Sequence, residues 1–128
     1  MAKILIVEDE KQIADMIAFK LTNSGHQVIR AQDGEQALKL ARLDIPDLIM
    51  LDAMMPGLSG FEVLRRLKID SELRAVPVIM VTAKGHERDV LSGLRGGAVD
   101  YVLKPFSLKE LAARVELALG KDRPPTML

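Results

Sequence analysis

Short runs of apolar residues recur along the chain and predict the strands of a buried sheet. The runs occupy residues 4–7, 27–30, 48–51, 78–81 and 99–103. Four of the five are apolar at nearly every position, and the run at 27–30 is the weakest. A strand with water on one face alternates apolar and polar residues, whereas a strand covered on both faces does not. The sequence therefore predicts a sheet that helices cover on both sides.

Segments between these runs carry apolar residues at helical spacing. Ile13, Ile17 and Leu21 follow one another at intervals of four, and Leu111 and Val115 do the same near the end of the chain. Residues four apart lie on one face of an α-helix, so each set forms a stripe that can pack against the sheet. We interpret these stripes as core positions and not as a cofactor-binding face.

Three of the predicted helices begin with a capping box, a short polar residue followed three positions later by Glu or Gln. The pairs are Asp33 with Gln36, Ser59 with Glu62, and Ser107 with Glu110. Each side chain of such a pair can bond the other residue's free backbone N–H. Strands and helices thus alternate along the chain, which predicts an α/β fold. We expect a five-stranded parallel sheet with right-handed crossovers, helices on both faces and the common strand order 2-1-3-4-5.

The length of the chain, 128 residues, matches one ordinary domain. We expect this domain to span residues 1–120 and residues 121–128 to form a linker or a loose C-terminal tail, because Gly120 and the prolines that follow cannot continue a helix. The first apolar run is far too short for a signal peptide or a membrane span. The sequence therefore predicts a cytoplasmic protein that does not enter a membrane, with no output domain after the tail.

Positive and negative charges balance over the whole chain. It contains 18 lysines and arginines and 18 aspartates and glutamates, so no broad field favours nucleic acid or an anionic surface as the main partner. We expect no direct nucleic-acid contact by this domain. The chain has no cysteine, which excludes disulfides, thiolate metal ligands and thiol nucleophiles. Any function that depends on charge must therefore be local.

Polar side chains follow the strands at the points where the strands end. Glu8 and Asp9 follow the first run, Asp52 follows the third, Thr82 the fourth and Lys104 the fifth. In an open parallel sheet, ligands bind at the carboxyl ends of the strands, where the strand order reverses. In the order predicted here, this point lies between the first and third strands. We expect all five residues at that edge.

Three carboxylates at one edge need a cation, because two of them about 4 Å apart repel by roughly 4 kcal/mol at an effective dielectric constant near 20. Hard oxygen donors without histidine or cysteine favour magnesium or manganese over zinc or copper. Asp52, beside such an ion, is a candidate nucleophile for phosphoryl transfer. Lys104 can balance the phosphoryl oxygens, and the Thr82 hydroxyl can donate a hydrogen bond to them.

The motifs at these strand ends resemble those of response-regulator receiver domains over about residues 2–120. They are ILIVEDE at 4–10, DLIMLD at 47–52 continuing through MPG at 55–57 to Gly60, VTA at 81–83, and DYVLKPF at 100–106. The resemblance implies the flavodoxin-like receiver fold and a phosphorylation-dependent switch of a two-component system. It also implies a cis peptide bond between Lys104 and Pro105.

The resemblance assigns a role to each site residue. Asp52 would be the phosphoacceptor, Glu8 and Asp9 the acidic pair that serves Mg²⁺, and the backbone carbonyl of Met54 a further ligand. The donor would be a sensor histidine kinase or a histidine phosphotransfer protein. Such a domain assists its own phosphorylation and dephosphorylation without being an enzyme that turns over a substrate. We further hypothesise that Met54 and Lys84 set the lifetime of the phosphoryl group, Met54 by hindering an attacking water.

A switch is also implied by the resemblance. Once Asp52 is phosphorylated, Thr82 would move toward the phosphoryl group and Tyr101 would turn inward to fill the space that Thr82 leaves. The output surface would be helix 4, strand 5 and helix 5, and helix 4 is the weakest helix by sequence because Gly93 lies inside it. Without the resemblance, Tyr101 is equally well a half-buried aromatic residue of a strand.

The pattern is closest to receivers of the winged-helix transcription-factor branch, which dimerise through charged pairs on the output surface. Here Asp100 and Arg114 would supply one pair and Glu110 half of another. The expected homodimer is weak, because exposed ion pairs contribute only about 0 to 1 kcal/mol each. The sequence departs from the charge pattern of that branch at Val90, Arg95 and Val99.

Two other functions stay open. One is a phosphohydrolase that uses Asp52 as a turnover nucleophile; such enzymes usually place an acid two residues later, where this chain has Met54, and carry a cap insertion that this chain lacks. The other is an interaction module that keeps the fold but works without phosphorylation. Chemistry with a small phosphodonor would separate the three.

Overall fold

The computed structural model describes residues 1–83, 91 and 95–120. Its strands are β1 (Lys3–Val7), β2 (Gln27–Ala31), β3 (Leu48–Asp52), β4 (Val78–Ala83) and β5 (Asp100–Lys104). Its helices are α1 (Lys11–Asn23), α2 (Gly34–Leu43), α3 (Gly60–Ile69) and α5 (Leu108–Ala118). The predicted fourth helix lies outside the described residues, apart from Leu91 and Arg95.

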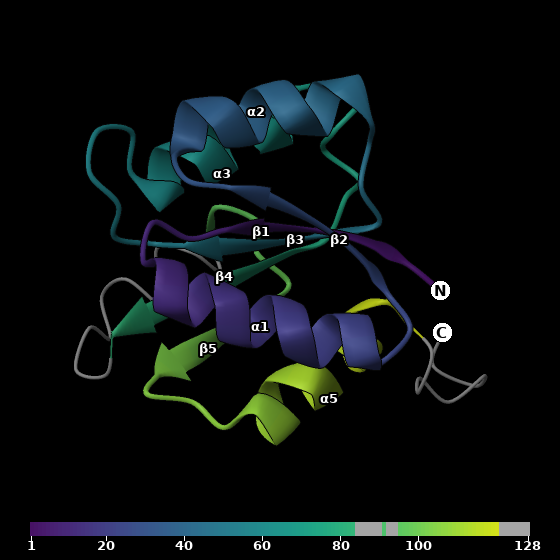
Figure 1. The fold of residues 1–128 in the computed structure, drawn as a ribbon. Helices are drawn as coiled ribbons and strands as arrows, with labels where there is room; N and C mark the ends of the chain where they lie inside the picture. The colour runs from purple at the N-terminus through teal and green to yellow at the C-terminus, as the bar shows by residue number, and fades with distance from the viewer. Residues whose placement is uncertain (84–90, 92–94, 121–128) are drawn as a thin grey trace.

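The five strands form one parallel sheet in the order β2-β1-β3-β4-β5. Helices α2 and α3 cover one face of this sheet, and α1 and α5 cover the other (Figure 1). The predicted α/β fold and strand order are therefore confirmed. None of the helices in the described part of the chain is long and apolar enough to cross a membrane.

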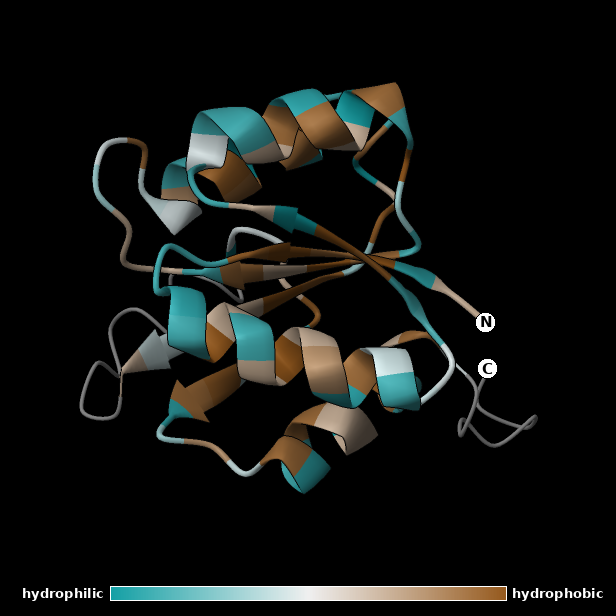
Figure 2. Ribbon diagram, in the orientation of Figure 1, coloured by the Kyte–Doolittle hydropathy of each residue, from teal (hydrophilic) through white to brown (hydrophobic). Residues whose placement is uncertain are grey.

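Each face of the sheet has its own hydrophobic core. Leu5, Ile49 and Leu51 point toward α2 and α3, whereas Ile4 and Met50 point toward α1 and α5. Successive residues of a strand point to opposite faces, so a strand between two cores must be apolar at every position. Figure 2 shows this composition as brown central strands and as helices whose polar residues lie away from the sheet.

All three predicted capping residues cap their helices. Asp33, Ser59 and Ser107 each accept a hydrogen bond from the backbone N–H three residues later. In α2 the return bond differs from the usual capping box, because the Gln36 side chain accepts from the N–H of Gln32 and not from that of Asp33. These caps determine the residues at which the helices begin.

The ends of three strands and the start of β5 differ from the prediction. Strands β3, β4 and β5 extend to include Asp52, Thr82 and Lys104, so these site residues belong to the sheet and do not follow it. Val99 lies just before β5 and is 47% exposed. Its N–H already bonds to the carbonyl of Val78, so only its backbone joins the sheet.

Candidate functional site

The register of the central strands brings the predicted site residues to one edge of the sheet. Val7 lies opposite Leu51, which places Glu8 beside Asp52. On the other side of β3, Thr82 comes one residue after the partner of Asp52. Chain segments far apart in the sequence therefore meet at the carboxyl ends of three neighbouring strands. This edge is the crevice at which open parallel sheets bind their ligands.

Three carboxylates converge at this edge. Glu8, Asp9 and Asp52 each offer an oxygen, and these oxygens all lie within 4.8 Å of one another. Glu8 and Asp52 are only 4% and 3% exposed, whereas Asp9 is exposed to solvent. Buried carboxylates this close repel unless a cation or a proton lies between them. An all-oxygen donor set fits magnesium or manganese, so these residues are suited to a divalent cation of that kind.

Among the described residues, the Lys104 ammonium contacts both buried carboxylates. Its Nζ lies 3.2 Å from Glu8 Oε1 and 3.3 Å from Asp52 Oδ2. Burial alone lowers the pKa of the Lys104 ammonium, but the charges of Asp52 and Glu8 outweigh this and leave the pKa above its ordinary value. Lys104 therefore carries its positive charge at neutral pH. The Lys104–Pro105 bond is cis, as the resemblance implies.

Glu8 keeps a proton more tightly than an exposed glutamate does. Burial, a hydrogen bond with Asp52 and the charge of Asp52 raise its pKa from 4.5 to about 7. The N–H of Glu10, 3.2 Å from Glu8 Oε2, and the charge of Lys104 act in the opposite direction. Because a cation binds the ionised carboxylate, a metal that enters the site has to displace this proton.

The stability of the metal-free protein is expected to fall as the pH rises from about 5 to about 7.5. Between pH 4.5 and about 7 the folded protein holds a proton on Glu8 that the unfolded chain has lost. The free energy of unfolding therefore decreases through this window, by about 1 to 2 kcal/mol because water reaches one side of the site. Urea unfolding in EDTA at pH 5 and at pH 7.5 measures this change in the free energy of unfolding. If the free energy of unfolding of Glu8→Gln decreased equally between these pH values, the decrease would not come from the Glu8 proton.

The two oxygens of Asp52 face different partners. Oδ1 accepts a hydrogen bond from the backbone N–H of Met54 at 3.1 Å, and Oδ2 faces Lys104. The Met54 side chain is 57% exposed, so it borders the site from the solvent side. Lys84, the other residue of the lifetime hypothesis, lies outside the described residues. The carboxylate is thus held in one orientation by its own strand-end loop.

Thr82 is buried beside the carboxylates with an unsatisfied hydroxyl. It is 2% exposed, and its Oγ1 has no hydrogen-bond partner among the residues that the structure describes. A buried hydroxyl without a partner costs about 1 to 3 kcal/mol. Such a group is available to a ligand that brings an acceptor to the strand ends.

Valine at position 82 is therefore expected to leave the unmodified protein as stable as the wild type, or about 1 kcal/mol more stable, because it replaces the hydroxyl by a methyl group of similar size. Urea unfolding in EDTA gives the difference. Thr82→Ser, which keeps the hydroxyl, is the control. A loss of more than about 1 kcal/mol in Thr82→Val would show that the hydroxyl is satisfied in the unmodified protein.

The predicted output surface carries Tyr101 and a charged cluster. Tyr101 is partly buried and packs against the core beneath α2 and α3. Arg114 Nη1 lies 2.8 and 2.9 Å from the two oxygens of Asp100, and its Nε lies 3.5 Å from Glu110 Oε1. The residues predicted to pair between two chains are thus paired within one chain.

Glu10 also belongs to the site, although its position in the sequence predicts no separate role for it. Its carboxylate lies 3.9 Å from Lys104 Nζ, and its N–H orients the Glu8 carboxylate. The signal was present in the sequence as a third acid directly after Glu8 and Asp9. It adds negative charge on the solvent side of Lys104.

Comparisons with known proteins agree with this geometry. A family model described as the response regulator receiver domain matches residues 4–116. The chain is 44% identical over 122 residues to the phosphate regulon transcriptional regulatory protein PhoB of Escherichia coli K12, covering 95% of this chain and 53% of PhoB. It is 47% identical over 120 residues to the alkaline phosphatase synthesis transcriptional regulatory protein PhoP of Bacillus subtilis, covering 94% of this chain and 49% of PhoP.

Solved structures give the same result. A putative response regulator from Chloroflexus aurantiacus matches with a TM-score of 0.90 and 34% identity, covering 93% of this chain and 98% of its own. The chemotaxis protein CheY4 of Vibrio cholerae matches with a TM-score of 0.87 and 30% identity, covering 92% and 98%. The chain therefore belongs to the response regulator receiver domains, phosphorylation-dependent signalling domains of two-component systems. It is similar in particular to transcriptional regulators, and it spans about half the length of these curated relatives.

Proposed function

We propose that Asp52 accepts a phosphoryl group from a phosphohistidine of a sensor histidine kinase or a histidine phosphotransfer protein. Convergence of an oriented, buried carboxylate with two further acids and Lys104 at one edge supports this proposal. An Asp52 oxygen attacks phosphorus, the bond from phosphorus to the histidine nitrogen breaks, and that nitrogen leaves with the electron pair. Because Lys104 Nζ already contacts both buried carboxylates, its ammonium group can also balance the negative charge of the phosphoryl oxygens.

Mg²⁺ would be held by the carboxylates of Glu8, Asp9 and Asp52 and by the backbone carbonyl of Met54. When bound, the ion neutralises charge on these carboxylates and on the phosphoryl oxygens. Asp9 is exposed and therefore reachable by an ion that keeps several waters. Glu8 gives up its proton when the ion enters, and the Glu10 N–H then holds the ionised form in place.

Thr82 and Tyr101 would transmit the modification. The unsatisfied Thr82 hydroxyl gains an acceptor when the phosphoryl group is present, and this gain favours a shift of β4 toward Asp52. Tyr101 would then turn inward and alter the surface of β5 and α5. A weak homodimer through this surface would require Asp100 and Arg114 to exchange their present contact for one with a second chain.

Incubation with Mg²⁺ and acetyl phosphate, followed by intact mass, tests the proposal. We expect one phosphoryl adduct per chain, which is absent when EDTA replaces Mg²⁺. Continuous release of phosphate from phosphate esters would support a phosphohydrolase instead. No adduct from acetyl phosphate or from a phosphorylated histidine phosphotransfer protein would support an interaction module that works without phosphorylation.

A further inference from the structure

The Lys68 ammonium is held by the loop that follows its own helix. Lys68 lies in the last turn of α3, and its Nζ donates to the carbonyls of Arg74 at 3.1 Å and Val76 at 2.9 Å. A turn from a later part of the chain covers the stem, because a Cβ atom on Gly97 would lie only 3.3 Å from Lys68 Cγ and Cδ. Contacts at the ammonium and along the stem thus hold a side chain that is usually flexible.

Burial makes this ammonium easier to deprotonate. Lys68 is partly buried, and burial lowers its pKa below the ordinary value of 10.5. Among the described residues no carboxylate pairs with it. Lys104 is the opposite case, because the charges of two carboxylates keep its pKa above the ordinary value. A lysine has to lose a proton before its nitrogen can attack an electrophile, so burial raises the nucleophilic fraction of Lys68.

The two carbonyls also suit the transition state of acyl transfer. A neutral amine has two hydrogens and one lone pair, so the bonds to the carbonyls of Arg74 and Val76 leave the lone pair of Lys68 Nζ available to a reagent. Positive charge develops on the nitrogen as it attacks a carbonyl carbon, and hydrogen-bond acceptors that are already in place stabilise this charge. The contacts that hold the amine therefore also favour its reaction.

Arg74 gives the site a preference among acyl donors. It is exposed, and its own carbonyl lies 3.1 Å from Lys68 Nζ, so its guanidinium can reach a reagent that meets this amine. In the part of the chain that the structure describes, no carboxylate pairs with this guanidinium. Guanidinium groups bind phosphate oxygens through two parallel hydrogen bonds. An acyl phosphate, which joins a reactive acyl carbon to a phosphate group, fits both residues.

We propose that Lys68 is a site of acylation by acyl phosphates, with Arg74 binding the phosphate end of the reagent. The lone pair of Lys68 Nζ attacks the acyl carbon, the bond from this carbon to the phosphate oxygen breaks, and phosphate leaves with the electron pair. The nitrogen then loses one proton to phosphate or water. This reaction does not depend on the proposed function of Asp52, which attacks the same class of reagent at phosphorus and not at carbon.

Acylation changes the contacts that Lys68 makes with the loop and the turn. An amide nitrogen carries one hydrogen, so one of the two carbonyls loses its partner, and the positive charge is removed. The added acyl group has to fit beside the turn at Gly97, just before β5. The modification therefore acts on the segment that leads into β5, which is part of the predicted output surface.

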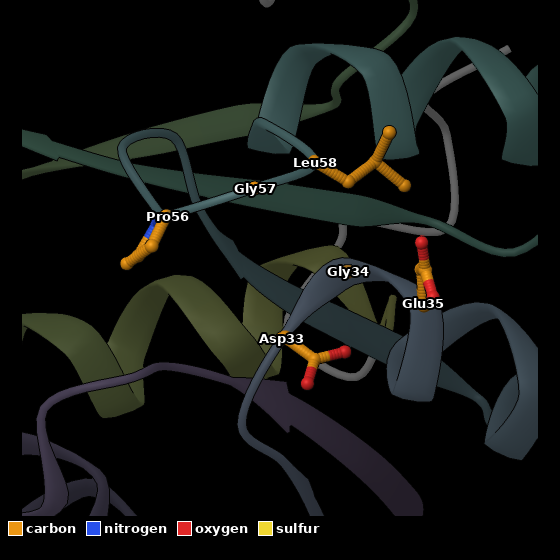
Figure 3. A pocket seen from close by; sticks show the side chains of 6 residues that line it. All are labelled: Asp33, Gly34, Glu35, Pro56, Gly57 and Leu58. Carbon is orange, nitrogen blue, oxygen red and sulfur yellow. The ribbon is translucent and has the colours of Figure 1, made fainter.

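Lys39 is the matched control. It lies in α2 on the same face of the sheet, is exposed, and its ammonium has no hydrogen bond to any described residue. Glu35 precedes it by one helical turn, and Figure 3 shows Glu35 and Asp33 at a pocket of about 410 Å³. The lining of this pocket includes two acids and no base, so it repels the phosphate of an acyl phosphate.

The test incubates the full chain with acetyl phosphate in EDTA, which withholds the Mg²⁺ needed for the proposed phosphorylation, and follows each lysine by peptide mass spectrometry. We expect acetylation of Lys68 at neutral pH to be about 3- to 10-fold faster than that of Lys39. Arg74→Gln is expected to slow Lys68 about threefold and to leave Lys39 unchanged. With N-acetoxysuccinimide, an acyl donor without phosphate, Arg74→Gln should not change the rate at Lys68. In urea that unfolds the chain, the two lysines should react alike.

Equal rates at Lys68 and Lys39 in the folded wild type would overturn the inference. An equal effect of Arg74→Gln with both reagents would also overturn it, because the substitution would then alter the loop and not the binding of phosphate. No effect with acetyl phosphate would remove the role of Arg74. If Lys68 is acetylated faster than Lys39 but Asp52 takes up no phosphoryl group with Mg²⁺, the inference stands and the proposed function fails.

Discussion

Asparagine at position 52 is expected to abolish phosphoryl uptake and to leave the fold intact. The side chains of Asp and Asn have the same shape, and the Asn oxygen can still accept the hydrogen bond that Met54 donates to Asp52 Oδ1. The amide oxygen lacks the charge of a carboxylate nucleophile, so no acyl phosphate forms. Intact mass after incubation with acetyl phosphate and Mg²⁺ gives the result, together with a circular dichroism spectrum like that of the wild type.

Asp70→Asn is the matched control for this experiment. Asp70 Oδ1 accepts a hydrogen bond from the N–H of Glu72 at 2.9 Å, the same relation over two residues that joins Asp52 to Met54. That hydrogen bond keeps the pKa of Asp70 below its usual value, so it is also a carboxylate at neutral pH. We expect the control to form the adduct as the wild type does. An adduct that persists in Asp52→Asn would place the phosphoacceptor elsewhere.

Methionine at position 104 is expected to slow phosphorylation and to destabilise the metal-free protein. Without the ammonium, Glu8 and Asp52 lose the cation that lies 3.2 and 3.3 Å from them, and the pKa of Glu8 rises further. We expect a loss of about 1 to 3 kcal/mol at pH 8 in EDTA, limited because Glu8 can keep its proton. Phosphorylation from acetyl phosphate should be about 100-fold slower, because the phosphoryl oxygens lose a fixed positive charge.

Lys11→Met controls for the loss of a lysine near the site. Lys11 Nζ lies 3.0 Å from Asp15, and exposed ion pairs one helical turn apart contribute little to stability. Urea unfolding at pH 8 and the rate of phosphorylation should both stay close to those of the wild type. If Lys104→Met behaved like Lys11→Met in both measurements, Lys104 would have neither role.

The positions of the strands and helices could be predicted from the sequence because burial on two faces leaves a clear pattern. A strand between two cores has no polar positions, so the runs at 4–7 and 48–51 identify β1 and β3 directly. Val99 was misplaced because its apolar side chain continues such a run while only its N–H joins the sheet. The predicted fourth helix falls outside the described residues.

The residues of the candidate site could be predicted from the sequence, but the burial of each residue and the distances between them could not. Glu8 and Asp9 are equivalent by sequence, yet Glu8 is buried and Asp9 is exposed, because neighbouring residues at a strand end point in opposite directions. The hydrogen bond from the Gly60 N–H to the carbonyl of Ala53 could not be inferred either, since it depends on how far α3 lies from β3. Burial and distance depend on how the helices pack on the two faces of the sheet, which the sequence pattern does not give.

The location of the site at the ends of four strands has a consequence for how the chain folds. Lys104 contacts Asp52 from 52 positions further along the sequence, and it reaches Glu8 only after β5 has docked on β4. Contacts so distant along the chain form late, after most of the loop-closure entropy has been lost. During synthesis, a chain that ends before β5 already contains Glu8 and Asp52 but lacks Lys104, which contacts both of them in the folded protein. The candidate site is therefore completed only when β5, the last strand along the chain, has joined the sheet.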